Sequence, residues 1–160
     1  MARRAFFSFH YERDIWRANV VRNSWITHGD REAAGFWDAS LWEEAKRKGD
    51  YAIRQMIDNG LHNTSITVIL IGAETSKRKY VQYEIEQSFE RGKGLLGIYI
   101  NQIGDRNGNT DYTGHNPFKD FKDTYGTPFT QLFYTYYWFN DDGYRNIGSW
   151  IRQAAEEAGR

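Results

Sequence analysis

A short apolar run followed by an amphipathic segment, within residues 65–92, constrains the fold more than any other feature of the chain. Residues 66–71 are apolar and rich in β-branched side chains, which is typical of a strand buried on both faces. After a small polar loop, Val81, Ile85 and Phe89 recur at the spacing of one helix face. The sequence therefore predicts a buried strand and a helix that packs on the same sheet.

Glu84 lies on the flank of this apolar helix face. At about 100° per residue, it stands roughly 60° from Val81 and about 100° from Ile85. We therefore expect its carboxylate near the loop at the carboxyl end of the strand, where open α/β sheets bind ligands. The alternative is a glutamate that is solvated on the helix surface, which is the commoner place for this residue type.

Strands and helices are predicted to alternate along the rest of the chain. Further strands are expected at residues 5–9, 34–37, 95–100 and 132–139, and helices after residue 14, at 41–60 with a second part beginning near Asp50, and at 144–159. The first helix is expected to turn Ile15, Trp16, Val20 and Val21 toward the core. Because parallel strands need helical crossovers, this alternation implies a flavodoxin-like α/β fold, an open parallel sheet of about five strands flanked by helices. We expect one domain over residues 1–160.

Composition excludes several classes of function. There is no cysteine, so disulfides, thiolate zinc sites and cysteine nucleophiles are ruled out. Basic and acidic residues number 21 each, whereas a nucleic-acid-binding protein normally shows a basic excess. The four histidines have no metal-ligand spacing, and neither a dinucleotide-binding nor a P-loop glycine motif is present. With no long apolar run and no signal-peptide pattern, we expect a cytoplasmic protein without a membrane, nucleic-acid or metal partner.

Polar residues follow several of the predicted strands at the ends that meet on one edge of a parallel sheet. They are His10, Tyr11 and Asp14 after the first strand, Asp38 and Ser40 after the second, and Glu74, Thr75 and Ser76 after the third. Each has a structural alternative: Asp14 and Asp38 as helix caps, Ser40 and Thr75 as turn formers. Together they match what a nucleotide-sized ligand would require.

These segments resemble TIR domains. The opening FFSFHYERD is similar to their first strand and loop, and GAETSKRKYVQYEIEQS is similar to the signature that follows their central strand. Glu84-Ile85 falls on the Glu–aliphatic pair of that signature, and Tyr80 falls on its aromatic position. The chain resembles more closely the TIR-like ThsB family of the Thoeris antiphage-defence system, through AGFWDASLWEEAKR, GLHNTSITVILIG, YEIEQS, the Asn116-Pro117-Phe118 loop and DDGYRNIGSWI, in this order. This resemblance covers essentially the whole chain.

The resemblance implies an NAD⁺ glycohydrolase or ADP-ribosyl cyclase that cleaves the nicotinamide–ribose bond and makes a cyclic ADP-ribose isomer as an immune signal. Glu84 would be the catalytic carboxylate, and NAD⁺ would be the substrate, with no further cofactor. The implied partners are a downstream effector that responds to the diffusible product and, on activation, further copies of the chain. Two alternatives stay open: a non-catalytic TIR interaction module, and a nucleotide binder without turnover.

Carried over, the expected substrate contacts are Phe9, His10, Tyr11, Asp14, Phe36, Trp37, Asp38, Ser40, Thr75, Ser76 and Tyr80. Among these, Phe9, Phe36 and Trp37 would form aromatic walls together with Trp42. The chain departs from receptor-type TIR domains in two places. The loop after the second strand is short, and Lys79-Tyr80-Val81 replaces the usual serine–tryptophan–cysteine sequence ahead of the glutamate.

Overall fold

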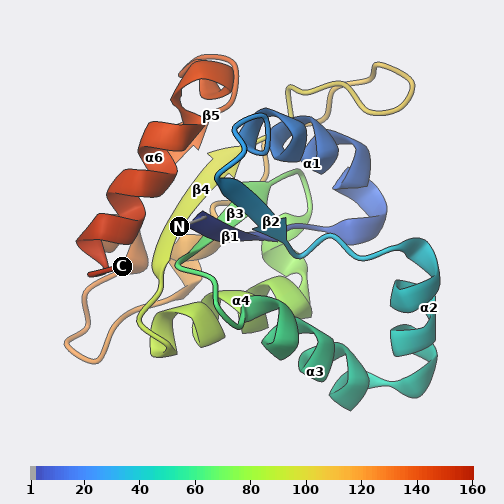
Figure 1. Ribbon diagram of the computed structural model, residues 1–160, viewed down its shortest axis with the longest axis horizontal. Coiled ribbons are helices and arrows are strands. Elements are labelled where there is room, and N and C mark those ends of the chain that lie inside the picture. Colours follow the sequence, from blue (N-terminus) through green and yellow to red (C-terminus); the bar gives the residue numbers. More distant parts are fainter. Residues whose placement is uncertain (1–2) are drawn as a thin grey trace.

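Five parallel strands in the order β2-β1-β3-β4-β5 form the sheet of this protein (Figure 1). The computed structural model describes residues 3–160. The strands are β1 (Arg3–Ser8), β2 (Arg31–Ala34), β3 (Ile66–Ile71), β4 (Gly94–Tyr99) and β5 (Thr135–Tyr137). The helices are α1 (Tyr11–Trp25), α2 (Ala39–Lys48), α3 (Asp50–Leu61), α4 (Lys79–Glu90), α5 (Phe129–Leu132) and α6 (Gly143–Glu157), with short 3₁₀ turns η1 (Thr75–Lys77) and η2 (Pro117–Asp120). This order is the flavodoxin-like one, which confirms the predicted fold class.

The central strand, β3, is buried along its whole length. It pairs in parallel with β1 on one side and with β4 on the other, so each of its backbone edges is satisfied within the sheet. A strand that is covered on both faces carries apolar residues on both, and therefore reads as a continuous apolar run. The predicted bounds of this strand, residues 66–71, are those observed.

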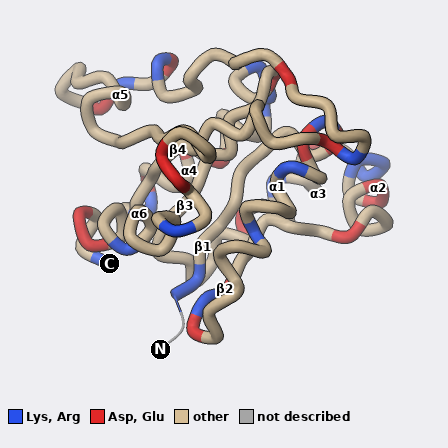
Figure 2. Tube along the Cα trace, turned by 90° about the horizontal axis from the view of Figure 1, so that it is seen from above, with Lys and Arg blue, Asp and Glu red and all other residues tan. Residues whose placement is uncertain are grey.

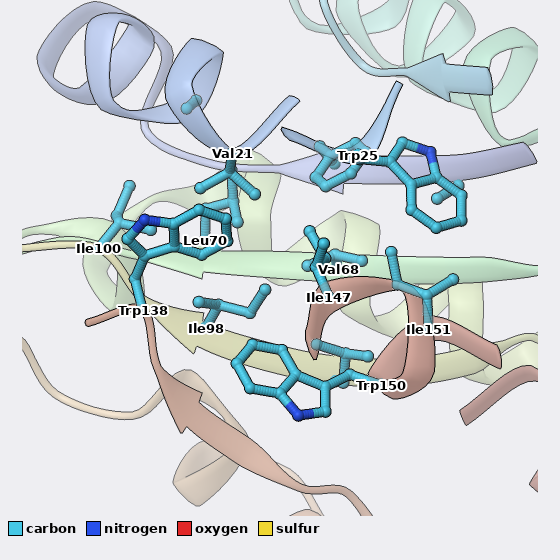
Figure 3. Packing of buried hydrophobic residues seen from close by; sticks show 14 of the residues in the cluster. Val21, Trp25, Val68, Leu70, Ile98, Ile100, Trp138, Ile147, Trp150 and Ile151 are labelled. Atoms are coloured by element: carbon cyan, nitrogen blue, oxygen red, sulfur yellow. The ribbon is translucent and has the colours of Figure 1, made fainter. Parts of the chain in front are cut away.

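Helices cover both faces of the sheet (Figure 1). On one face, α1 and α6 bury Val21, Trp25 and Ile151 against alternate residues of β3 and β4, as Figure 3 shows. On the other face, α3 packs on Phe6 of β1 and α4 packs on Ile69 and Ile71 of β3. In residues 3–160, none of the helices combines the length and the hydropathy needed to cross a membrane.

The predicted second strand, residues 34–37, is wrong in its bounds. The strand is β2, Arg31–Ala34, which overlaps the predicted range only at Ala34. Gly35 ends it with a φ of +93°, close against the backbone of Phe7, where a side chain would collide. Because β2 pairs only with β1 at the edge of the sheet, it tolerates polar residues that a central strand would not.

The predicted apolar face of the first helix is also partly wrong. Trp16 and Val20 are 51% and 39% exposed, whereas Asp14 and Arg17 are buried. The Arg17 guanidinium is 2.9 Å from Asp14 Oδ1, and it donates to the carbonyls of Ile103 and Asn109 at 2.7 and 2.8 Å. A buried ion pair that also holds the loop after β4 therefore decides which face of α1 turns inward.

The last predicted strand, residues 132–139, is shorter than expected. Its first residue ends the one-turn helix α5, and only Thr135–Tyr137 pair with β4. The helical stretch at 41–60 divides as expected near Asp50, at Gly49, whose φ of +104° is one that side chains rarely adopt.

We expect Arg17→Met to destabilise the protein by roughly 3 kcal/mol, because it leaves the Asp14 carboxyl buried without its partner. Urea unfolding measures this loss. Arg47→Met is the matched control: Arg47 is exposed on α2, and we expect a change within about 0.5 kcal/mol. Equal unfolding midpoints for wild type and Arg17→Met would show that the ion pair does not hold α1 in place.

Candidate active site

Glu84 is buried, with 5% of its side chain exposed, so the solvated alternative is wrong. Helix α4 packs Val81 and Ile85 on β3, as its periodicity predicts. The same small pocket is lined by Glu84, by Ile57 of α3, by Phe7 of β1 and by Phe9, which follows β1. The flank of α4 is therefore covered as well as its apolar face, which a single-helix pattern does not reveal.

The carboxyl group of Glu84 is held by Ser8, the last residue of β1. Ser8 Oγ donates to Glu84 Oε1 at 2.7 Å, and Ser8 is fully buried. Burial raises the pKa of Glu84 from 4.5 to about 8, while the hydrogen bond from Ser8 acts in the opposite direction. Burial therefore favours the protonated, neutral form of this carboxyl group near neutral pH.

An aromatic pocket surrounds Glu84. Its other lining residues include Phe9, Tyr11, Trp37, Trp42, Arg78 and Tyr80. The Tyr11 and Trp42 rings lie 4.9 Å apart, and the Trp37 and Trp42 rings are stacked at 6.1 Å with 13° between their planes. The cavity has a volume of about 20 Å³, which is room for about one water molecule. The rings thus leave little room beside Glu84.

A cluster of charged groups joins the elements around the pocket mouth. Glu12, in the first turn of α1, is 3.2 Å from Arg78 at the start of α4 and 3.2 Å from Lys46 of α2. The indole of Trp42 also donates to Glu12, at 3.3 Å. One carboxylate therefore connects α1, α2 and α4, and it holds two residues of the pocket lining, Trp42 and Arg78.

Part of the sequence-predicted site meets in this pocket. Phe9, Tyr11, Trp37 and Tyr80 line it together with Glu84, and so does Trp42. His10 stands beside it as the N-cap of α1, where its Nδ1 accepts from the Arg13 amide at 3.2 Å. Burial, and then the charge of Arg78, lower the pKa of His10, which places it near that arginine.

Other predicted contact residues lie elsewhere. Asp14 is no helix cap: it is fully buried within α1 and paired with Arg17. Phe36 packs on Phe7 and Phe9 from the side of the α1 core, with ring centroids 5.6 and 5.1 Å away. Asp14 and Phe36 are thus packed inside the protein and do not line the pocket.

The remaining predicted contacts have local structural partners. Asp38 caps α2, where it accepts from the Leu41 amide at 2.9 Å and from Ser40 Oγ at 2.7 Å. Thr75 Oγ1 accepts from the Gly72 amide at 2.7 Å and so shapes the turn after β3. Ser76 is buried in the same turn. The structural alternatives are therefore confirmed for Asp38, as a helix cap, and for Thr75, as a turn former.

Ser8 and Arg78 were not predicted as site residues. Ser8 could have been found as the polar residue at the carboxyl end of an apolar strand, on the face that also carries Phe6. Arg78 gives no such signal, since a basic residue ahead of a helix is usually solvated. In residues 3–160, no group of three or more His, Asp or Glu side chains is arranged to hold a metal ion.

An open parallel sheet in this order, with a buried glutamate on the helix that follows its central strand, is the arrangement expected of a TIR-type domain. Residues 6–105 match the family described as "Thoeris protein ThsB, TIR-like domain". The chain belongs to this family. A Bacillus cereus (strain MSX-D12) protein, ThsB1, is 39% identical over 191 residues, covering 94% of this chain and 100% of that protein, and is named as a candidate cyclic ADP-D-ribose synthase.

The raised pKa of Glu84 predicts how stability depends on pH. Between the unfolded value of about 4.5 and the folded value of about 8, the folded state binds a proton that the unfolded state lacks. The free energy of unfolding should therefore fall as pH rises through this range, by at most about 1.4 kcal/mol per pH unit.

In Glu84→Gln this contribution should be absent, so that the variant gains stability relative to wild type as pH rises. Urea unfolding across the range measures the difference. Glu86→Gln, at an exposed position of the same helix, should follow wild type. Parallel pH dependences for wild type and Glu84→Gln would contradict the assignment of the shifted pKa to Glu84.

Proposed function

We propose that this protein is an NAD⁺-consuming TIR enzyme, which cleaves the nicotinamide–ribose bond and makes a cyclic ADP-ribose isomer as an immune signal in antiphage defence. The observation that carries the proposal is the buried Glu84 carboxyl, held by Ser8 inside an aromatic pocket. The pocket lies where the strand order reverses, between β1 and β3, and this is the place where open α/β sheets bind nucleotides. The name of the Bacillus cereus relative supports the same chemistry.

A single carboxylate suffices for this reaction. When the bond between the ribose C1 and the nicotinamide nitrogen breaks, both electrons go to nicotinamide, which leaves as a neutral molecule without needing a proton. The ribose is left as an oxocarbenium cation, and a carboxylate held next to it stabilises the positive charge. Glu84 is proposed for this role. NAD⁺ is thus the substrate, since the bond that breaks is its own.

The raised pKa of Glu84 is compatible with this role. In the closed pocket the carboxyl group is neutral at pH 7 because burial disfavours its charge. The nicotinamide ring of NAD⁺ is a cation, and an opposite charge close to a carboxylate favours ionisation. Substrate binding would therefore supply the charge that lets Glu84 ionise, at the moment when the carboxylate is needed.

Cyclisation requires that a nucleophile of the same molecule attacks C1 in place of water, and we assign this role to a ribose hydroxyl. The new C–O bond forms as the hydroxyl gives up its proton, and Glu84 can accept that proton as general base. Walls formed by Phe9, Tyr11, Trp37 and Trp42 would keep water away from the cation. A pocket that admits water would instead release linear ADP-ribose.

The pocket must open before NAD⁺ can enter, since about 20 Å³ holds no more than a water molecule. Opening would separate the stacked rings or the contacts that Glu12 makes with Arg78 and Lys46. We propose that activation includes this step together with self-association of the chain. The product would act on a downstream effector, in the cytoplasm, where NAD⁺ is present.

Glu84→Gln should abolish nicotinamide release, by about 10³-fold or more, because an amide cannot supply the negative charge. The measurement is chromatography with mass detection after incubation with NAD⁺. Wild type should give nicotinamide and a product at the mass of ADP-ribose less one water. Glu86→Gln should behave as wild type. If wild type leaves NAD⁺ intact even with lysate of phage-infected cells, the interaction module replaces the enzyme as the better reading.

Ser8→Ala should shift the pH dependence of kcat/KM upward. In wild type this ratio should rise with pH up to a pKa near 8, as Glu84 ionises in the free enzyme. Without the Ser8 hydrogen bond the carboxylate is harder to form, so activity at pH 7 should fall about 3- to 10-fold and recover at higher pH. A loss that is equal at every pH would show that Ser8 does not act through Glu84.

A further inference from the structure

A second cavity, of about 360 Å³, lies at the end of the sheet opposite to Glu84. It opens where β1 and β2 begin, and it is bordered by α6. Its charged lining consists mainly of arginines: Arg3 from β1, Arg31 from β2 and Arg152 from α6. Figure 2 shows the basic segments at the start of β1 and β2 next to each other.

The pairing of the two strands brings like charges together. Arg3 and Arg31 are direct partners in the β1–β2 register, whereas the next pair, Arg4 and Glu32, is of opposite charge. Two like charges held at neighbouring positions repel each other. A bound anion between Arg3 and Arg31 would compensate this repulsion.

No carboxylate in the described residues 3–160 supplies this compensation. Neither Arg3, Arg31 nor Arg152 has an acidic side chain within 4.0 Å. Asp30 lines the cavity, but it is exposed and lies beyond this distance from all three guanidinium groups. With three arginines and one aspartate in its lining, the cavity keeps a net positive charge.

Neutral groups hold two of the three arginines in place. The Arg31 guanidinium lies 4.6 Å from the centre of the Trp25 ring and donates to the Trp25 carbonyl at 3.4 Å. It also rests against Gly148 of α6, where a Cβ atom would come within 2.2 Å of its Nη2. Arg3 donates to Ser65 Oγ at 3.3 Å. A glycine inside a helix is less stable than alanine, and here it makes the room that Arg31 occupies.

We propose that this cavity binds a phosphate-bearing small molecule, through a diphosphate group. Guanidinium groups match phosphate oxygens with paired hydrogen bonds, and three of them suit a multiply charged anion better than a single carboxylate. The Ser149 hydroxyl lines the same cavity. Its volume lies within the range of about 300–1,000 Å³ typical of small-molecule sites. The balanced net charge of the chain argues against a nucleic-acid backbone as the source of the phosphates.

This second site is separate from the pocket of Glu84 and does not depend on the proposed reaction. Isothermal titration calorimetry with inorganic pyrophosphate tests it directly. Wild type should show saturable binding that weakens as salt rises. Arg152→Gln should weaken binding about tenfold or more, since it removes a charge-assisted contact. Gly148→Ala should weaken it as well, by displacing Arg31. The control is Arg106→Gln, at an exposed position in the loop after β4, which should bind as wild type does.

Two further measurements distinguish lost binding from lost folding, and a small-molecule ligand from a nucleic acid. Without ligand, Arg152→Gln should unfold at the same temperature as wild type or higher, because it relieves repulsion, so lost binding would not reflect lost folding. ADP should bind at least as tightly as pyrophosphate. The proposal is overturned if wild type shows no saturable pyrophosphate binding or if Arg152→Gln binds equally well. It is also overturned if a single-stranded oligonucleotide binds more tightly than both small molecules.

Discussion

The burial of β3 on both faces is the constraint on which the rest of the molecule depends. A strand with no solvent-facing side needs helices above and below, and its two backbone edges need β1 and β4 as neighbours. This arrangement places the reversal of strand order between β1 and β3. It also brings the end of β1, with Ser8, against α4, with Glu84. The candidate catalytic carboxyl is therefore buried as a consequence of how the central strand is covered.

The same dependence explains what could be predicted from the sequence. Residues 66–71 carry a local signal, so the strand was predicted with its observed bounds and the helix after it with the correct apolar face. The edge strand β2 was misplaced because an edge position accepts polar residues, so that its pattern is that of a loop. Helix periodicity placed Glu84 near the end of the central strand, and the family motif alone implied its catalytic role. Ser8 was missed although its place at the end of an apolar strand is a signal, whereas the role of Arg78 arises only when α1 and α4 come together.

Asp14 shows why a polar residue near a strand end is an uncertain guide to a ligand site. Its position after β1 suited a substrate contact, but its carboxylate forms a buried ion pair with Arg17 of the same helix. The two ends of the sheet also differ in how their charged groups are treated. At one end burial disfavours the charge of a carboxyl group, and at the other three arginines stand together without an acidic side chain within 4.0 Å. Local rules of charge pairing are broken at both ends, and functional sites are where such exceptions are expected.

Trp37 and Trp42, which are stacked nearly parallel in the wall of the Glu84 pocket, absorb and emit in the near ultraviolet. Two indole rings with centroids 6.1 Å apart are close enough for their electronic transitions to couple. Opening of the pocket would change their separation, their mutual angle or their contact with water. The near-ultraviolet circular dichroism and the tryptophan emission of the unmodified protein therefore carry a signal from the wall itself. A change in these spectra would report a rearrangement of Trp37 and Trp42 in the pocket wall.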